Sequence, residues 1–199
     1  MRKDLAKGAC DIRVITGLAR GRRLEAPQGW NTRPTSARVK EAAFSIIQFE
    51  TPGARVLDLF SGTGQMGIEA LSRGAGQCVF VENARESLAV LRKNLETSGP
   101  WQNAKIMPTD AVGYLKGLER GVFDIALLDP PYAAGLLADC LKLLAEKMRP
   151  GGVVLCEADA RLDLPESIPP LMRKKSYKYG STRLFHYRVS DDQGQGERH

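Results

Sequence analysis

The chain has 199 residues, of which 43% are hydrophobic and 26% are charged, a composition typical of a globular protein with one α/β domain. No apolar run approaches the roughly 18 residues that a membrane span requires. The first residues, Met1–Lys7, lack the apolar stretch of a secretory signal peptide, so we expect the protein to remain in the cytoplasm.

The net charge of +6 is unevenly distributed along the chain. Residues 1–40 hold ten Lys or Arg against three Asp or Glu, and residues 171–190 hold six against none. The segment between them, 41–170, is acidic, with 12 against 17. Basic ends favour a polyanionic partner such as nucleic acid, although a solvated basic surface would give the same pattern.

The cysteines and histidines argue against a metal centre or a disulfide framework. The four cysteines are widely spaced, with no Cys-x-x-Cys pair. Cys78 and Cys156 fall in expected buried strands, where a free thiol behaves as a small apolar group. The two histidines, His186 and His199, are too few for histidine-based metal or triad chemistry, so we predict no metal site.

Residues 12–25 are predicted to form a short β-hairpin. Apolar residues alternate toward a turn region marked by Gly17 and Gly21. This element is too small to fold alone. It carries four arginines, Arg13, Arg20, Arg22 and Arg23. We predict that the hairpin packs on the main domain and offers these arginines to phosphates. The alternative is a solvated edge ribbon.

A helix is predicted after the loop Asn31–Pro34. Thr35 or Ser36 can cap its start, and Thr51–Gly53 is expected to end it. Apolar residues recur at helical spacing between these signals, at Val39, Ala42, Ala43, Ile46 and Ile47.

Strands and helices then alternate along the chain. Strands are predicted over 55–60, 77–82, 103–107, 123–128 and 153–157, and helices over 65–73, 84–97, 110–118 and 135–147. This alternation predicts a mostly parallel sheet with helices on both faces. Residues 175–189 are predicted to form a second hairpin, turning at Gly180-Ser181, which makes the last strand antiparallel.

The predicted fold is therefore α/β, with a seven-stranded, mostly parallel, Rossmann-like sheet. The antiparallel last strand departs from dinucleotide-binding Rossmann domains and agrees with class I S-adenosylmethionine (SAM) methyltransferases. We divide the chain into an N-terminal extension with the basic hairpin, 1–30, and a main domain, 31–189. The polar, Gly/Gln-rich tail, 190–199, is expected to be disordered.

A glycine-rich turn follows the strand at 55–60. Gly62, Gly64 and Gly67 satisfy Gly-x-Gly-x-x-Gly, and Glu82 lies 20 residues beyond the first of them, at the end of the next strand. Glycines let the backbone approach a ligand, the following helix offers its positive end, and a carboxylate at Glu82 can accept both ribose hydroxyls. The pattern predicts a nucleoside cofactor, and alone fits NAD as well as SAM. A merely structural turn is the alternative.

Two aspartates favour SAM over a dinucleotide. Asp58, just before the glycine turn, can face a methionine ammonium group, which a dinucleotide lacks. Asp110, at the end of the third strand, could accept a hydrogen bond from the adenine amine. Either side chain could instead cap a helix or form a turn.

Asp129-Pro130-Pro131-Tyr132 ends another apolar strand and is the most specific motif. An exocyclic amine on a base is a poor nucleophile because its lone pair is delocalised. Asp129 and the Pro130 carbonyl could accept its two N–H groups and orient the nitrogen, while Tyr132 could stack on an unstacked base. The prolines stiffen the loop. A coincidental turn of the same sequence is the alternative.

Taken together, these motifs resemble the bacterial 16S ribosomal RNA guanine-N2 methyltransferase family over residues 12–189. The resemblance rests on four segments: Thr32–Phe44, Val56–Gly64, Val81-Glu82 and Leu128–Tyr132. It implies transfer of the SAM methyl group to the exocyclic N2 of a guanine in 16S rRNA, with no metal. It also places Arg33 and Thr35 near the cofactor and target base; from the residues alone, Arg33 could equally contact a phosphate.

We expect the hairpin arginines and the basic segment near the C-terminus to bind the RNA backbone, with Lys174, Lys175 and Arg183 in the second group. By resemblance, the substrate is expected to be 16S rRNA within a small-subunit particle. A monomer is expected. Three alternatives stay open: a DNA adenine-N6 methyltransferase, an NAD-dependent oxidoreductase and a non-catalytic rRNA-binding assembly factor.

Overall fold

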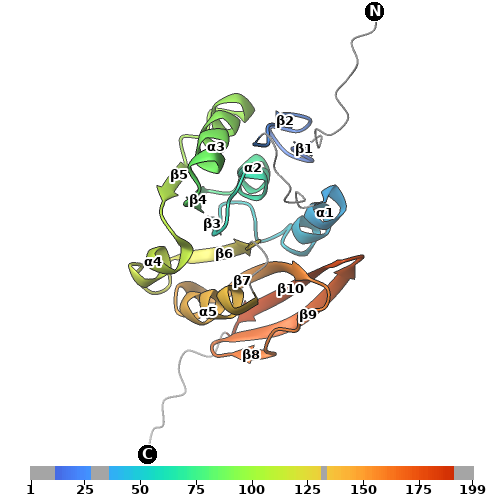
Figure 1. Cartoon of the computed structure of the whole chain (residues 1–199), viewed down its shortest axis with the longest axis vertical. Coiled ribbons are helices and arrows are strands. Elements are labelled where there is room, and N and C mark those ends of the chain that lie inside the picture. The colour runs from blue at the N-terminus through green and yellow to red at the C-terminus, as the bar shows by residue number, and fades with distance from the viewer. Residues whose placement is uncertain (1–11, 28–35, 131–133, 191–199) are drawn as a thin grey trace, which may run out of the picture.

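The structure is a computed structural model that describes residues 12–27, 36–130 and 134–190 (Figure 1). Its elements in chain order are β1 (Ile12–Arg13), β2 (Arg23–Leu24), α1 (Ala37–Ile46), β3 (Arg55–Asp58), α2 (Gln65–Ser72), β4 (Gln77–Glu82), α3 (Arg85–Ser98), β5 (Ala104–Pro108), α4 (Ala111–Lys116), β6 (Phe123–Leu128), α5 (Ala134–Ala145), β7 (Met148–Asp159), β8 (Ser167–Ile168), β9 (Leu171–Tyr179) and β10 (Thr182–Val189). Among these described helices, none is both long and apolar enough to cross a membrane.

The main sheet has eight strands in the order β5-β4-β3-β6-β7-β10-β9-β8. The first five are mutually parallel, and β10 pairs antiparallel with both β7 and β9. The predicted fold is confirmed, including the hairpin that turns at Gly180, where φ is +61°. The eighth strand, β8, is a two-residue addition at the edge beside β9.

Strand β7 starts earlier than predicted. Pro150–Gly152, which lies between the helix predicted over 135–147 and the strand predicted over 153–157, is inside β7, and the helix ends at Ala145. The register between β6 and β7 shifts between Phe123 and Ile125, beside this segment. A proline without an N–H and two glycines are tolerated at such an irregularity, although they usually interrupt a strand.

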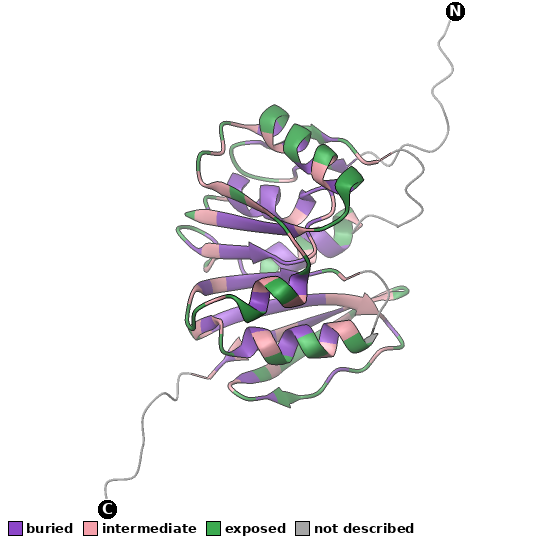
Figure 2. Cartoon of the chain, turned by 60° about the vertical axis from the view of Figure 1, so that its left-hand side comes forward, coloured by how far each residue is buried: buried purple, intermediate pink, exposed green. Residues whose placement is uncertain are grey.

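Alternate residues of the strands build a core on each face of the sheet. On one face, α4 and α5 pack against side chains such as Leu128 and Cys156. On the other, α1, α2, α3 and the N-terminal hairpin pack against side chains such as Leu127 and Leu155. Figure 2 shows buried strands between helices whose outer surfaces are exposed. The continuous apolar runs in the sequence follow from this two-sided burial.

The N-terminal hairpin is held by polar contacts to α2 as well as by apolar packing. Strands β1 and β2 pair antiparallel, as predicted. The buried carboxylate of Glu69 accepts the backbone N–H groups of Ile15 at 2.7 Å and Thr16 at 3.0 Å. Ser72 Oγ donates to the Thr16 carbonyl at 2.6 Å and accepts from Ala19 N at 2.9 Å.

Gly17 fits this contact because it has no side chain. Its φ is +86°, and a Cβ there would lie 1.8 Å from the Ser72 carbonyl oxygen. Any other residue would clash with the backbone of α2 and adopt an unfavourable conformation. The hairpin turn and α2 are therefore matched in shape.

Lys40, on α1, completes the buried network around Glu69. Its amino group lies 3.4 Å from Glu69 Oε2 and donates to the Arg13 carbonyl at 2.6 Å. Arg73 Nε donates to Glu69 Oε1 at 2.8 Å. Burial lowers the pKa of Lys40, and the Glu69 carboxylate opposes that shift.

Asn94, a buried residue of α3, joins the hairpin to the glycine turn. Its Nδ2 donates to the carbonyls of Glu25 at 3.0 Å and Thr63 at 2.9 Å. Its Oδ1 accepts from Glu25 N at 2.8 Å. The amide thereby uses both N–H donors and its oxygen on main-chain groups.

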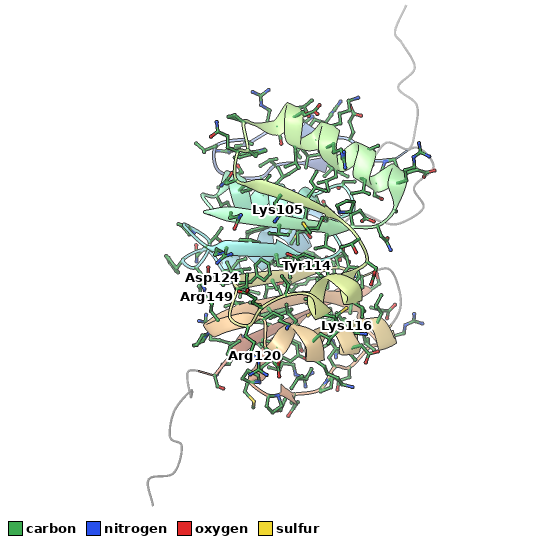
Figure 3. All side chains as sticks on the ribbon, turned by 90° about the vertical axis from the view of Figure 1, so that its left-hand side faces the viewer. Lys105, Tyr114, Lys116, Arg120, Asp124 and Arg149 are labelled. Carbon is green, nitrogen blue, oxygen red and sulfur yellow. The ribbon has the colours of Figure 1, made fainter. Side chains whose placement is uncertain are left out.

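The amino ends of three parallel strands are fixed by one aspartate. Asp124 Oδ2 accepts from Arg55 N at 2.8 Å, and Asp124 Oδ1 pairs with Arg149 Nη1 at 2.9 Å. These residues belong to β6, β3 and β7, and Figure 3 shows Asp124 beside Arg149 at this edge. The contacts align the strands whose carboxyl ends form the site described below.

Replacing Glu69 with alanine is expected to destabilise the protein by about 3–5 kcal/mol, because it leaves the buried Lys40 ammonium without its carboxylate. Urea unfolding followed by circular dichroism measures this change. The matched control is Glu41→Ala, an exposed glutamate on α1, expected to change stability by less than ~0.5 kcal/mol. A loss below about 1 kcal/mol for Glu69→Ala would mean that the network contributes no more than a surface pair.

Candidate active site

A cavity of about 760 Å³ opens at the carboxyl ends of the parallel strands. It lies where the chain order of the strands reverses, since β3 is followed by β4 on one side and has β6 on the other. Ligands of open α/β sheets bind at such a switch point. The cavity brings together six predicted site residues: Asp58, Gly62, Glu82, Asp110, Asp129 and Pro130.

The glycine turn forms one wall of the cavity. Gly62 and Gly64 both have positive φ, +52° and +80°, which favours glycine. A Cβ on Gly64 would lie 2.4 Å from Leu91 Cδ1, so this glycine also allows α3 to approach. Gly62 lines the cavity, whereas Gly64 is buried behind it as the N-cap of α2.

Glu82 clamps the end of β4 to the glycine turn. Its Oε2 accepts from Gly62 N at 2.9 Å, and its Oε1 accepts from Asn83 N at 2.8 Å and Ala84 N at 2.7 Å. A carboxylate has about four acceptor positions, so three of them are engaged by the backbone. The remaining one, on Oε2, can accept a ligand hydroxyl without breaking a protein contact.

Asp58 is the most deeply buried carboxylate of the cavity wall, with 4% of its surface exposed. Its Oδ2 accepts from Gly67 N, in the first turn of α2, at 2.9 Å. Burial raises the pKa of Asp58 to about 7, the Gly67 hydrogen bond opposes the shift, and the Asp129 and Glu82 carboxylates add to it. A ligand cation in the cavity would favour its ionised form.

Asp110 has the capping role that its sequence position allowed. It is the N-cap of α4, and its Oδ1 accepts from Gly113 N at 2.7 Å. It also lines the cavity, so capping and a ligand contact are compatible. Ser36 similarly caps α1, its Oγ accepting from Val39 N at 3.2 Å, and it lines the cavity too.

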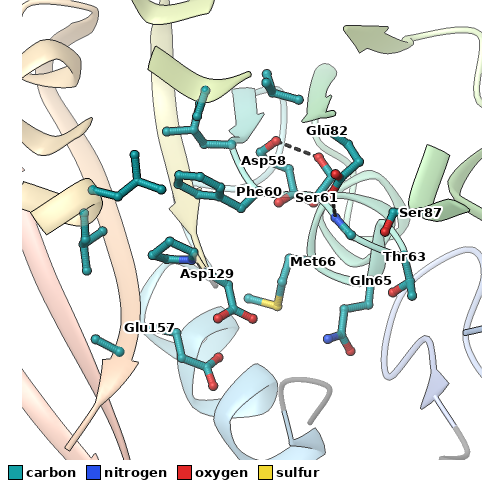
Figure 4. A pocket seen from close by; sticks show the side chains of 18 of the residues that line it. Asp58, Phe60, Ser61, Thr63, Gln65, Met66, Glu82, Ser87, Asp129 and Glu157 are labelled. Atoms are coloured by element: carbon teal, nitrogen blue, oxygen red, sulfur yellow. Dashed lines mark hydrogen bonds between the residues drawn. The ribbon is translucent and has the colours of Figure 1, made fainter. Parts of the chain in front are cut away.

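Asp129 and Pro130 directly follow β6 and reach the cavity, where Figure 4 shows the Asp129 carboxylate facing Met66. Tyr132, Arg33 and Thr35 lie outside the described residues, so their predicted roles stay predictions. Gln65 and Met66, from the start of α2, also line the cavity. Neither was proposed from sequence as a site residue.

Glu157 was also missed by the sequence analysis. It lies in β7 and lines the cavity, and Figure 4 shows its carboxylate near that of Asp129. The only sequence signal was an acidic residue after the buried run Val153–Cys156. No turn residue follows it to mark the end of a strand, because β7 continues to Asp159.

The cavity is strongly acidic. Its described lining includes six carboxylates: Asp58, Glu82, Asp110, Asp129, Glu157 and Asp159. The single cation among these lining residues, Arg161, pairs with Asp159 through two hydrogen bonds of 2.8 and 2.9 Å. Within the described residues, no cluster of three His, Cys, Asp or Glu has a geometry that could hold a metal ion.

The predicted RNA-binding residues lie on two surfaces. Arg13, Arg20, Arg22 and Arg23 are exposed on the hairpin, and Arg13 Nη1 donates to the Gly21 carbonyl at 3.1 Å. Lys174 and Lys175 are exposed on β9. Arg183 is half-buried, with its guanidinium over Phe185 and 3.8 Å from Asp163. These intramolecular contacts already engage its guanidinium group.

The family model described as "Conserved hypothetical protein 95" matches residues 12–188. YlbH of Bacillus subtilis is 36% identical, covering 89% of this chain and 98% of the relative. The Haemophilus influenzae protein named ribosomal RNA small subunit methyltransferase D is 33% identical, covering 90% of this chain and 95% of the relative.

Solved structures agree with these matches. That of yhhF from Escherichia coli is 30% identical and superposes with a TM-score of 0.81, covering 92% of this chain and all of the other. An RNA methyltransferase from Salinibacter ruber in complex with S-adenosyl-L-homocysteine, 15% identical over 84% of this chain and 100% of the other with a TM-score of 0.63, shares the fold alone. The chain belongs to the family described as conserved hypothetical protein 95, and its relatives include proteins named ribosomal RNA small subunit methyltransferase D.

Proposed function

We propose that the protein transfers a methyl group from SAM to the exocyclic N2 of a guanine in 16S rRNA of the small ribosomal subunit. The observation that carries this proposal is the placement of Asp129-Pro130 in the same cavity as the glycine turn and Glu82. A strand-end pair able to orient an amine therefore faces a nucleoside-type pocket. The names of the relatives support ribosomal RNA as the substrate.

The charge of the cavity favours SAM over NAD. SAM carries a sulfonium and an ammonium group, which suit a wall of carboxylates, whereas the pyrophosphate of NAD would be repelled. In this arrangement Asp58 faces the ammonium, the free acceptor position of Glu82 takes a ribose hydroxyl, and Asp110 faces the adenine amine. Gly62 lets the backbone approach the methionine portion, and Gly64 behind it permits the tight turn. SAM therefore fits the residues present.

Methyl transfer then needs only orientation and charge stabilisation. When bound, SAM would supply an electrophilic methyl group to the N2 lone pair, and S-adenosylhomocysteine would be the leaving group that takes the electrons of the carbon–sulfur bond. Asp129 and the Pro130 carbonyl accept the two N–H groups and stabilise positive charge on the nitrogen, whose surplus proton leaves to water. The family resemblance assigns Tyr132 the role of stacking on the unstacked base, and assigns Arg33 and Thr35 roles beside the cofactor and the target base.

The basic hairpin and β9 supply the contacts to RNA phosphates. The hairpin arginines and Lys174 and Lys175 are exposed, whereas the cavity is acidic, so RNA is held at the rim and only a neutral base needs to enter. We expect a monomer acting on a small-subunit particle.

The proposed reaction is tested with methyl-labelled SAM and small subunits from cells lacking the protein. Free 16S rRNA and unmodified DNA serve as parallel substrates, and labelled nucleosides are identified after digestion. Label in N2-methylguanosine of 16S rRNA is expected. Label in DNA adenine would instead indicate an adenine-N6 enzyme, and RNA binding without any label would indicate an assembly factor.

Replacing Asp129 with asparagine is expected to lower kcat by about 10²–10³-fold, because the amide lacks the negative charge that stabilises the nitrogen in the transition state. Single-turnover methylation of small subunits measures this rate. Asp139→Asn, an exposed residue of α5, is the control and should retain wild-type kcat. A normal rate in Asp129→Asn would remove Asp129 from the chemistry.

From the raised pKa of Asp58, we predict that cofactor binding releases a proton near neutral pH. Without ligand, its raised pKa means that the folded state holds a proton that the unfolded state has lost, so this contribution to stability declines as pH rises from about 4 to 7. An ammonium ligand favours the ionised form, and about half a proton should be released on binding at pH 7.

Calorimetric titration with S-adenosylhomocysteine in buffers of different ionisation enthalpy measures this release. Asp58→Asn should abolish it, whereas Asp139→Asn should retain it. Wild-type affinity should also weaken as pH falls below 7. Equal binding enthalpies in all buffers at pH 7 would contradict the assignment of Asp58.

RNA binding is expected to weaken steeply with salt, and each hairpin arginine that contacts a phosphate contributes to that slope. Arg20→Ala and Arg22→Ala should each reduce the slope of log K against log[salt] by about 0.7–0.9. Filter binding to small subunits over a salt series measures it. Arg120→Ala, an exposed arginine before β6, is the control, and its slope should match wild type. Unchanged slopes in both hairpin variants would place the RNA elsewhere.

A further inference from the structure

Glu157 occupies the same position on β7 that Asp129 occupies on β6. The two strands are parallel neighbours, and their register pairs Leu128 with Cys156. Asp129 and Glu157 are the next residues on each strand. Adjacent strands lie about 4.8 Å apart, so these two side chains are direct neighbours across the sheet.

The alternation of the strands directs both carboxylates to the same side. Leu127 and Leu155 pack on the face covered by α1–α3, and Leu128 and Cys156 pack on the opposite face. The following residues return to the first face. A second, small cavity agrees with this, since both carboxylates line it together with Val39 and Ala43 of α1.

On the side away from Asp129, the neighbours of Glu157 are apolar residues. Glu157 pairs in register with Leu184 of β10, and Leu155 and Leu184 line the same small cavity. Water is therefore restricted around one side of the carboxylate, which strengthens a hydrogen bond made there. Its exposed side faces the main cavity, next to Asp129.

Two adjacent carboxylates match the hydrogen-bonding edge of guanine and do not match that of adenine. Guanine presents its N2 amine beside N1–H, so neighbouring atoms both donate hydrogen bonds. Adenine presents its N6 amine beside N1, which is an acceptor. A carboxylate placed next to the one that binds the amine accepts from guanine N1 and repels the lone pair of adenine N1.

The geometry points to Glu157 as the residue that selects guanine, by accepting the N1–H of the target base while Asp129 accepts from N2. This inference rests on the proposed function and deepens it, because Asp129-Pro130 alone would bind the amine of either base. Adenine loses the hydrogen bond that guanine N1–H makes, and its N1 lone pair faces the negative charge of the carboxylate, so the site disfavours adenine. Glu157 thus acts in base recognition, and Asp129 in orienting the amine.

The test compares guanine and adenine at the methylated position. That position is mapped with wild-type protein, and small subunits are prepared with plasmid-encoded 16S rRNA carrying either base there. Wild-type protein should methylate guanine at least about 100-fold faster than adenine. Glu157→Gln should lose about 10-fold or more on guanine, because a neutral amide is a weaker acceptor than a carboxylate.

The same variant should gain activity on adenine, because the glutamine amide can donate to adenine N1. A fall of about 100-fold in the guanine preference is expected, with S-adenosylhomocysteine affinity unchanged. Asp139→Asn is the control, since it removes an exposed carboxylate of α5 that is not among the residues lining the cavity. It should retain the guanine preference of wild type.

Two results would overturn the assignment. One is a Glu157→Gln variant with wild-type rate and preference. The other is a loss on guanine with no gain on adenine, which would give Glu157 a supporting role only. The wild-type protein distinguishes this outcome from failure of the proposed function. If the proposed function is wrong, the methyl label transferred by wild-type protein appears in a product other than N2-methylguanosine. Glu157 would then have no guanine to select.

Discussion

The parallel register of five strands is the constraint on which the site depends. In the order β5-β4-β3-β6-β7, the strands end at or near Asp110, Glu82, Asp58, Asp129 and Glu157. Each strand thus contributes one carboxylate to a single row along the sheet edge. Such a row is electrostatically costly unless backbone N–H groups and a cationic ligand compensate it. The contacts of Asp58, Glu82 and Asp110 with main-chain N–H groups supply the first compensation.

Helix α2 connects this row to the basic hairpin. In its first turn, the N–H of Gly67 donates a hydrogen bond to Asp58. Two residues later, the carboxylate of Glu69 accepts hydrogen bonds from the hairpin backbone. An element of eight residues therefore contacts the cavity with one end and the arginine-bearing hairpin with its side. The basic hairpin and the acidic cavity, visible only as charge blocks in the sequence, are physically linked by this short helix.

The sequence predicted the fold and singled out four of the six carboxylates that line the cavity, because these residues are marked by local chemistry. Asp58, Glu82 and Asp129 each follow an apolar run and precede glycine, proline or a helix start. Glu157 had no such mark, because β7 continues past it and its role arises from pairing with β6. Strand β8 was not predicted for the same reason, because its two residues become a strand only by pairing with β9. The early start of β7 through Pro150–Gly152 likewise depends on pairing between strands. Register is a property of two strands, and a one-dimensional pattern does not contain it.

The hydrogen bonds of Asn94 limit which substitutions this family can accept at the junction between the hairpin and the glycine turn. The amide contacts main-chain atoms of residues 25 and 63 and none of their side chains. Substitutions of the exposed Glu25 side chain therefore leave the junction intact, whereas Thr63 is buried and its side chain is limited by packing. At residue 94, aspartate would direct a carboxylate at two carbonyls, and leucine would remove the partner of three main-chain groups. Among divergent relatives, variation is expected to be free at residue 25, restricted at residue 63 and nearly absent at the asparagine.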